Sequence, residues 1–571
     1  MRYQLLSALF ALAAVVLCFA TLPAPRWDNM RVRHAWDAVP ENWEGLGIPS
    51  ADTTINLHLA LKPRREKALV TALYEEQVAE LVMPHPHTLE LVKSWLKYHG
   101  VPSSASLTHG GNWLTLTGVS VSKANDLLGA SYQLYRHTET KEIIIRTVGY
   151  SLPPALHGHV QTVAPTTFFA SPRMSWQTPR KRSGRAAAEQ VKATSGDFVT
   201  TLLGRADSED DVTPPFLRWL YNSITYVPAA TDRNVFGIAG YVKEYPNPVD
   251  LTTFMNRFHS PETRATYTVV EVDNGEYDPT NPGLEANMNV QYASGIAYPT
   301  PITYYSVGGD GTEGEDEQYL SWLNYMLGLD QIPQTISTSY ANYETELSLD
   351  YARAVCDLFM QLAARGISVL FSSGNDGVGE GDCMTDGNVR FKPTFPASCP
   401  WVTAVGGTTR YEPEIAADLS GGGFSDYFKR PDYQDEAVTT FFENSGDQYH
   451  GLYNASGRGF PDIAAQAFDI GIIFRNEYEV VEGTSCAAPI VAGIISLLND
   501  YQISQGRHPL GFLNPWLYGI ARAGLTDITS GSNPGCNTDG FSAIEGWDPV
   551  TGLGSLNFKR LQHILVANLL P

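Results

Sequence analysis

From residue 213 onward, short apolar segments alternate with longer segments of helical periodicity. The candidate strands are NVFGIAGYV, ATYTVVEV, PITYYSVGG, QTISTSY, GISVLFSSG and PWVTAVGGT, and the clearest helices are EDEQYLSWLNYMLGL, LDYARAVCDLFMQLAARG and APIVAGIISLLNDYQ. Buried strands separated by helices form a parallel sheet with helices on both faces. The sequence therefore predicts an α/β, doubly wound fold for residues 213–571, with a functional site at the carboxyl ends of the strands.

Residues 21–170 are predicted to form a separate α+β domain. EKALVTALYEEQVAEL and PHTLELVKSWLKYHG have helical periodicity, while NWLTLTGVSV and EIIIRTVGY are typical of strands. Residues 171–212 are polar and lack a hydrophobic period, so they are predicted to be a linker. Their basic triplet, Arg180, Lys181 and Arg182, predicts a processing site, with a solvated run of charge as the alternative.

The N-terminus, MRYQLLSALFALAAVVLCFATLPAPR, has one early arginine, an apolar run and then small residues and prolines. This pattern predicts a secretory signal over residues 1–20 and a secreted, extracellular protein, with a membrane anchor as the alternative. No other apolar run is long enough to span a bilayer, so we expect no membrane association after signal removal. The net charge of −22 argues against a nucleic-acid partner.

The cysteines also indicate an oxidising compartment. Cys18 lies in the signal, and five cysteines remain, which permits two disulfides and one free thiol with the pairing left open. Asn454, in NAS, is a candidate N-glycosylation acceptor, with an unused acceptor as the alternative.

The segment VVEGTSCAAPIVAG delivers Ser485 to the start of a predicted helix, with Pro489 in its first turn. A serine there is close to backbone N–H groups that can stabilise an oxyanion, although Gly-Thr-Ser also forms ordinary helix caps. SSGNDGVG follows a predicted strand and places Asn375 where its amide can donate to the same oxyanion. With TFPASCPWVTAVGGT and GRGFPDIAA, these segments have the order found in the subtilisin-like superfamily of serine peptidases.

A serine nucleophile needs a base to take its proton. No histidine after the linker has the glycine-flanked, helix-start context of a Ser-His-Asp triad, and we interpret all four as surface residues: His259, His450, His508 and His563. The remaining candidate is a carboxylate. In NPGLEANMNVQYASGIAYP, Glu285 and Asn289 are four residues apart and lie on one face of a predicted helix, although a solvated glutamate at a helix start is the alternative.

On these motifs the chain resembles the sedolisins, or serine-carboxyl peptidases, whose members include tripeptidyl-peptidases. The resemblance implies a secretory signal, an α+β propeptide and a subtilisin-like catalytic domain. It also implies that Glu285 is the base for Ser485 and that the enzyme works in acid, because a carboxylate base must be near its own pKa.

Two positions depart from the family pattern. Asn289 and Asn375 occupy positions that are usually aspartates. An amide at 375 donates a hydrogen bond at any pH, whereas Asn289 can orient Glu285 but cannot relay a proton. Asp376 is an alternative oxyanion residue if the loop is shifted by one position. These changes leave open a catalytically impaired homologue that binds or inhibits peptides.

The C-terminal segment LTDITSGSNPGCNTDGFSAIEGWDPVTGLGS is dense in glycine, asparagine and aspartate. Its hard oxygen atoms suit Ca²⁺, and a polar turn is the alternative. The resemblance implies one Ca²⁺ ion bound by Asp527 and Asp548 and by the carbonyls of Ile528 and Gly546, with Ile544 at a position that is often glycine.

We therefore predict a secreted zymogen whose propeptide covers the active-site cleft and whose catalytic domain cleaves peptides or denatured proteins. Ser485 attacks, Glu285 acts as base, Asn375 holds the oxyanion and Asn289 positions Glu285. Whether it releases tripeptides or cuts internally stays open. We expect a monomer. A structural secreted protein is a weaker alternative, because it gives no reason for the glutamate helix and the glycine-flanked serine to occur together.

Overall fold

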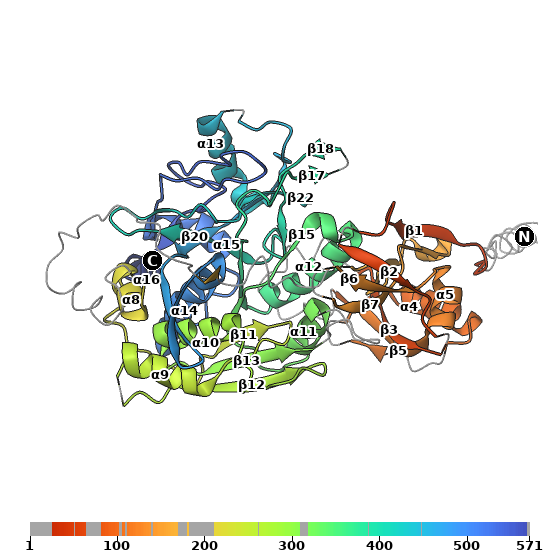
Figure 1. Cartoon of the computed structure of the whole chain (residues 1–571), viewed down its shortest axis with the longest axis horizontal. Coiled ribbons are helices and arrows are strands. Elements are labelled where there is room, and N and C mark those ends of the chain that lie inside the picture. Colours follow the sequence, from red (N-terminus) through yellow and green to blue (C-terminus); the bar gives the residue numbers. More distant parts are fainter. Residues whose placement is uncertain are drawn as a thin grey trace, which may run out of the picture.

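The computed structural model describes residues 25–40, 42–50, 52–63, 82–101, 106–108, 111–138, 141–169, 180–181, 211–260, 262–308, 318–385, 387–446 and 448–567. The predicted signal, the predicted helix at 66–81, Arg182 and most of the predicted linker lie outside the described residues. The chain forms a smaller N-terminal unit at one end and a larger unit that contains the rest of the fold (Figure 1).

The larger unit is built on an eight-stranded sheet in the order β12-β13-β11-β14-β16-β20-β21, with β24 also paired to β20. The strands are β11 (Phe236–Gly240), β12 (Tyr267–Val272), β13 (Ile302–Val307), β14 (Thr335–Thr338), β16 (Ser368–Ser372), β20 (Thr403–Thr409), β21 (Ile415–Ala416) and β24 (Ile463–Gln466). All pairings are parallel except that of β21. This confirms the predicted α/β fold and all six predicted strands.

Helices cover both faces of the sheet (Figure 1). One core contains side chains of α9 (Pro248–Phe258), α10 (Leu284–Ala297) and α14 (Thr484–Ser504). A second core contains side chains of α11 (Gln318–Leu327) and α12 (Leu349–Ala364). Of the described helices, α14 alone is long and apolar enough to cross a membrane, and 89% of its apolar window is buried inside the fold. Its hydrophobicity is therefore that of a central core helix.

Shorter elements complete this unit. They are α8 (Pro214–Leu220), β15 (Asn342–Tyr343), β17 (Met384–Thr385), β18 (Asn388–Val389), β19 (Thr394–Phe395), β22 (Gly423–Lys429), α13 (Asp435–Ser445), β23 (Gly457–Phe460), β25 (Ile470–Phe474), β26 (Glu477–Glu482), α15 (Asn514–Tyr518), β27 (Leu525–Thr526), β28 (Ser555–Leu556) and α16 (Phe558–Ala567). β25 and β26 form a hairpin that leads directly into α14.

The N-terminal unit has antiparallel sheets and two described α-helices, as an α+β domain requires. Its elements are β1 (Arg31–Ala35), β2 (Trp43–Gly47), β3 (Thr54–Leu61), α4 (Pro86–Tyr98), β4 (Ser106–Leu107), β5 (Trp113–Ser120), α5 (Val121–Leu128), β6 (Gln133–His137), β7 (Ile143–Arg146), β8 (Gly149–Leu152) and β9 (Val160–Ala164). The segment EIIIRTVGY, predicted as one strand, divides into β7 and β8.

The N-terminal unit packs on α12 (Figure 1). Arg33 pairs with Asp350 at 2.9 Å, and the ring of Phe168 lies 4.7 Å from that of Tyr351. We predicted that the propeptide covers the active-site cleft. The described contacts of its folded part include those with α12, and β10 (Arg180–Lys181) pairs with β26, the strand before Ser485. Covering of the cleft stays a prediction, because residues 170–179 and 182–210 lie outside the described residues.

Two residues that we assigned to the linker contact the larger unit. Val212 bridges to Ile470 of β25, and its carbonyl accepts a hydrogen bond of 2.8 Å from the hydroxyl of Tyr292 on α10. Asp211 accepts a hydrogen bond from Tyr478 on β26. Residues 211 and 212 therefore pack with the larger unit, at an edge of the β25–β26 hairpin.

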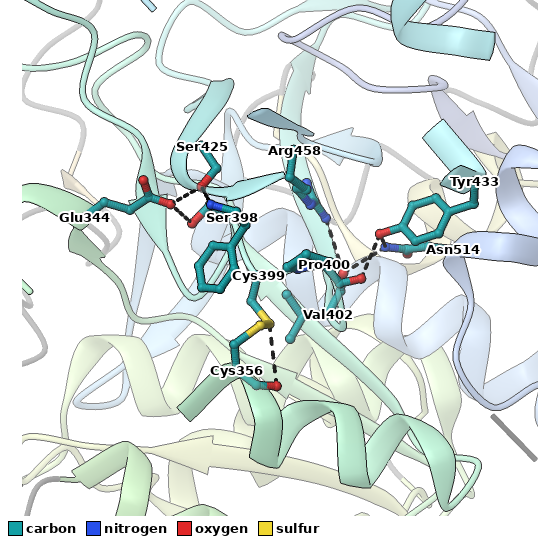
Figure 2. The surroundings of a disulfide bond; sticks show 11 residues. Glu344, Cys356, Ser398, Cys399, Pro400, Val402, Ser425, Tyr433, Arg458 and Asn514 are labelled. Carbon is teal, nitrogen blue, oxygen red and sulfur yellow. Dashed lines mark hydrogen bonds between the residues drawn. A yellow bond between two sulfur atoms is a disulfide. The ribbon is translucent and has the colours of Figure 1, made fainter. Parts of the chain in front are cut away.

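Cys356 pairs with Cys399 and Cys383 with Cys536, while Cys486 is free and buried, which confirms two disulfides and one thiol. The first disulfide ties α12 to the loop before β20 (Figure 2). Beside it, the fully buried carboxylate of Glu344 accepts hydrogen bonds from the hydroxyls of Ser398 and Ser425 at 2.6 and 2.5 Å. Burial raises the pKa of Glu344 to about 7.

Candidate active site

Three neighbouring strands end at the same edge of the sheet and deliver polar residues there. β11 is followed by Glu244, β14 by Ser339 and β16 by Asn375. Because these strands are parallel neighbours, their carboxyl ends meet, as in other open α/β sheets.

Ser485 is the second residue of α14 and is fully buried. The helix is preceded by Gly483, whose φ of 145° disfavours any residue with a side chain. Pro489 does not lie in the first turn as predicted, because the helix already begins at Thr484. Proline has no N–H to donate to the carbonyl of Ser485 four residues earlier. The hydroxyl of Ser339 donates to that carbonyl instead, at 3.3 Å.

Glu285 lies in the first turn of α10, and its side chain is buried, not solvated. The amide of Asn289 donates to Glu285 Oε1 at 2.7 Å and to the backbone carbonyl of Glu285 at 3.0 Å. The two side chains therefore point the same way, as the four-residue spacing predicts. The Ser339 hydroxyl also lies 3.2 Å from the amide oxygen of Asn289, so its single hydrogen is shared between this oxygen and the carbonyl of Ser485.

The pKa of Glu285 is well above its ordinary value. Burial is the main cause, and the nearby carboxylate of Glu244 raises the pKa further. The hydrogen bond from Asn289 and the nearby hydroxyls of Ser485 and Ser339 oppose this shift. The Ser485 hydroxyl thus lies near Glu285, although Glu285 Oε2 and Ser485 Oγ are both buried without a hydrogen bond of ordinary geometry. Such contacts commonly tighten only when substrate binds.

Asn375 is held by the residue before the serine. Its Oδ1 accepts hydrogen bonds from the backbone N–H and the hydroxyl of Thr484, at 2.7 and 2.9 Å. These contacts fix the amide orientation, so Nδ2 is the atom left buried without a partner. Asn375 therefore has an N–H group that is free to donate, and its assignment to the oxyanion stays a prediction.

Three residues of this site were missed by sequence analysis: Glu244, Ser339 and Thr484. Glu244 Oε2 accepts hydrogen bonds from the backbone N–H groups of Glu285 and Ala286, at 3.1 and 3.4 Å, and so caps α10. A side chain at Gly283 would overlap this carboxylate. The sequence held one signal for each of these three residues. Glu244 and Ser339 come just after predicted strands, and Thr484 directly precedes Ser485.

The four histidines of the catalytic unit lie elsewhere. His450, His508 and His563 are exposed, and His259 ends α9 with its ring against Tyr298. This agrees with their interpretation as surface residues.

The predicted calcium loop contains two desolvated carboxylates. Asp548 is fully buried and accepts hydrogen bonds from the backbone N–H groups of Ile544, Val550 and Thr551. Burial raises its pKa to about 8. Asp527 accepts a hydrogen bond of 2.8 Å from the N–H of Gly546.

Burial also raises the pKa of Asp527, and Gly546 has a φ of 94°, which glycine adopts readily. Among the described residues, no three His, Cys, Asp or Glu side chains gather around a possible metal position. The predicted ligand set has only two carboxylates.

Known proteins resemble the chain along most of its length. Residues 41–169 match the family described as Pro-kumamolisin, activation domain, and residues 278–507 match the Subtilase family. Tripeptidyl-peptidase SED2 of Arthroderma otae is 34% identical over 588 residues, which cover 94% of this chain and 96% of that protein. The probable tripeptidyl-peptidase SED3 of Trichophyton verrucosum is 35% identical over 576 residues, covering 92% of this chain and 94% of that protein.

Among solved structures, Pseudomonas sedolisin, a serine-carboxyl proteinase complexed with two molecules of pseudo-iodotyrostatin, shares the fold. Its TM-score is 0.51 at 23% identity, with 63% of this chain and 99% of that chain covered. The chain is therefore a serine peptidase that carries its own activation propeptide and acts on peptides, and the comparisons give no support to a noncatalytic homologue. It belongs to the sedolisin family.

Proposed function

We propose that this peptidase works by a Ser-Glu mechanism. The main support is that three polar atoms needed for acyl transfer are buried without hydrogen-bond partners. They are Ser485 Oγ, Glu285 Oε2 and Asn375 Nδ2. Leaving such atoms unpaired in a folded protein costs about 1–3 kcal/mol each, so a substrate that satisfies all three recovers that energy.

In the proposed reaction, Ser485 Oγ attacks the scissile carbonyl and Glu285 Oε2 takes the hydroxyl proton. Nδ2 of Asn375 donates to the oxyanion, and the backbone at the start of α14 lies on the same side. Glu285 then returns the proton to the leaving amine. In the second half, a water molecule gives a proton to Glu285 and attacks the acyl carbonyl, and Glu285 passes that proton to Ser485 Oγ as the ester bond breaks. Asn289 keeps Oε1 occupied, so Oε2 faces the serine.

This mechanism is tested with Ser485→Ala and Glu285→Gln. Both variants should lose about 10³-fold or more in kcat, while Asn289→Ala should retain more activity because it removes only the orienting group. Glu276→Gln, in an exposed stretch before α10, serves as a matched control. Full activity in Glu285→Gln would contradict the carboxylate base.

We further propose that the enzyme releases tripeptides from free N-termini. The named relatives are tripeptidyl-peptidases, and the chain spans nearly their whole length. Release of tripeptides is distinguished from internal cleavage with pairs of peptides that have the same sequence and either a free or an acetylated N-terminus. Products of three residues from the free peptide alone support the proposal, whereas equal internal cleavage of both indicates an endopeptidase.

One Ca²⁺ ion is proposed to stabilise the C-terminal loop. The carboxylates of Asp527 and Asp548 and the carbonyls of Ile528 and Gly546 would hold it. The fit is supported by the chemistry of these donors, because buried carboxylates with raised pKa values gain from a nearby cation. The role is structural and supplies no step of the reaction.

Chelation tests this site. EDTA near pH 7 should lower the melting temperature by roughly 5 to 10 °C. At pH 4 the effect should be smaller, because protonated aspartates bind the cation weakly. Asp548→Asn should remove the response. An unchanged melting temperature in EDTA at pH 7 counts against the site.

We also propose that the protein is secreted and monomeric. The N-terminal sequence supports secretion, and the two disulfides fit an oxidising compartment. N-terminal sequencing of the protein from culture medium, together with its mass in solution, tests both statements.

A further inference from the structure

The β25–β26 hairpin leads directly into the helix of the proposed nucleophile. β26 ends at Glu482, Gly483 follows, and α14 begins at Thr484. Because only one residue separates the strand from the helix, a displacement of the hairpin carries Ser485 with it. The position of the hairpin therefore bears on the position of the serine.

Side chains of α10 satisfy the outer edge of β25. The amide of Gln291 donates to the carbonyl of Ile473 at 2.6 Å and accepts the N–H of Ile473 at 2.9 Å. The hydroxyl of Tyr292 donates to the carbonyl of Gly471 at 2.8 Å. Gly471 and Ile473 are two residues apart, so their backbone groups point to the same edge of the strand. Without these side chains, that edge would have buried and unpaired backbone groups.

A second contact fixes the turn of the hairpin. Arg475 and Asn476 have φ angles of 54° and 64°, as a tight two-residue hairpin turn requires. The buried carboxylate of Asp250 on α9 accepts the backbone N–H groups of both turn residues, at 2.9 and 2.7 Å. It also accepts a hydrogen bond of 2.8 Å from the amide of Asn287 on α10. The hairpin is thus joined to α9 and α10 by a buried hydrogen-bond network.

The polar side chains of α10 serve two different partners. Glu285 and Asn289 belong to the candidate active site, whereas Asn287 and Gln291 contact α9 and the hairpin. At about 100° per residue, Gln291 lies about 120° around the helix from Glu285. One helix therefore carries the proposed base on one face and holds the hairpin of the nucleophile on another.

Direct packing of the two helices acts farther along α14. Gly493 contacts Ile296 of α10, but it is eight residues after Ser485, which is about 12 Å along the helix. At the N-terminal end of α14, Thr484 bonds Asn375, which follows β16. The hairpin is the connection that relates this end of α14 to α10.

We propose that Gln291 is a positioning residue for the catalytic pair. By holding Ile473 against α10, it keeps the hairpin, and with it Ser485, at the distance from Glu285 that proton transfer requires. Gln291 acts through β25 and β26 and takes no part in the reaction itself. The inference rests on the proposed roles of Ser485 and Glu285, and it adds a residue that supports them from outside the site.

The first test is Gln291→Met in the matured protein. Methionine is unbranched and of similar size, but it leaves the N–H and carbonyl of Ile473 without partners. We expect kcat and kcat/KM to fall together, by about 10²-fold, because a displacement near 1 Å is enough for such a loss. Steady-state kinetics on a peptide substrate measure both constants, at a temperature at which the variant is folded.

Gln434 provides a matched control. It is fully buried, and its amide donates to the carbonyl of Gly459 at 2.7 Å and accepts the N–H of Gly459 at 3.2 Å. Gly459 belongs to β23, which pairs with β22 and not with the hairpin. Gln434→Met therefore breaks the same kind of contact in another part of the fold. It should lose stability in urea unfolding and keep the natural kcat.

Gln291→Glu keeps the shape of the side chain and changes its proton. A protonated glutamate can accept from the N–H of Ile473 and donate to its carbonyl, whereas the ionised form can only accept. Relative to the natural protein at the same pH, kcat should be near one in acid. It should fall about 10²-fold, to the level of Gln291→Met, as the new carboxyl ionises. Urea unfolding over the same pH range locates that ionisation.

A folded Gln291→Met with the natural kcat overturns the proposal, and so does an equal loss of kcat in Gln434→Met. If Gln291→Met does not fold, Gln291→Glu decides, and a relative kcat that stays near one at every pH overturns the proposal. Full activity in Glu285→Gln would instead contradict the mechanism on which the proposal rests. The two failures are therefore distinguishable.

Discussion

Gly493 of α14 packs directly against Ile296 of α10, so closely that a methyl group on the glycine would overlap the isoleucine side chain. These are the helices that carry Ser485 and Glu285. We predict that Gly493→Ala separates them and lowers kcat about 10²-fold, because a displacement near 1 Å is enough for such a loss. The expected destabilisation is about 1–3 kcal/mol. Ser504→Ala, at the far end of α14, is the control. An unchanged kcat in Gly493→Ala would show that catalysis does not depend on the spacing of α10 and α14.

Ser339 is predicted to replace the helical hydrogen bond that Pro489 removes. Ser339→Ala leaves the carbonyl of Ser485 without its donor and should cost about 1 kcal/mol of stability together with a fall in kcat. Pro489→Ala restores an N–H at residue 489. The double variant should therefore regain stability relative to Ser339→Ala in denaturant unfolding, whereas additive losses would show that the two positions are not coupled.

The amide of Asn375 is predicted to remove one pH limit on activity. Asn375→Asp keeps an acceptor for Thr484, but its other oxygen donates to the oxyanion only when protonated. Its activity should match the natural protein in acid and fall about 10²- to 10³-fold as the pH rises through the pKa of the new carboxyl. Asn375→Ala should be impaired at every pH. A pH profile of kcat for the two variants checks this, and parallel profiles contradict it.

Asn289→Asp is predicted to change the shape of the pH profile. The natural enzyme should lose activity in acid as Glu285 becomes protonated, at a pH above the usual carboxyl range because burial raises the pKa of Glu285. A second carboxyl 2.7 Å from Glu285 Oε1 would share a proton with it. The acid limb should then move to lower pH and a new alkaline limb should appear. Activity only in the aspartate variant would mean that the natural chain is not a working Ser-Glu peptidase.

Glu344 is predicted to make the fold less stable toward neutral pH. Its pKa is raised to about 7 in the folded protein, so the stability it contributes is present in acid and is lost as the pH rises through that value. The shift corresponds to a change on the order of 3 kcal/mol. Glu344→Gln, in which Ser398 and Ser425 can turn to accept from the amide, should lose less stability between pH 5 and 8. A pH-independent difference between the two proteins in urea unfolding would contradict this.

Much of the fold followed from local pattern. The period of the apolar residues identified six of the seven strands that pair in parallel, because a strand buried on both faces has no polar face to interrupt it. The same local signals placed Ser485 at a helix start and put Glu285 and Asn289 on one helix face. Domain boundaries, localisation, the calcium ion and the monomeric state stay predictions.

The sequence by itself determined which residue types stand at the proposed nucleophile, base and oxyanion positions, because those assignments depend on neighbours along the chain. Only the tertiary structure decided that Ser339 bonds the carbonyl of Ser485, that Thr484 orients Asn375 and that Glu244 caps the helix of Glu285. It also decided the disulfide pairing and where the propeptide docks. These relationships join residues far apart in sequence. Burial, which raises the pKa of Glu285, exists only once the separate segments have packed together.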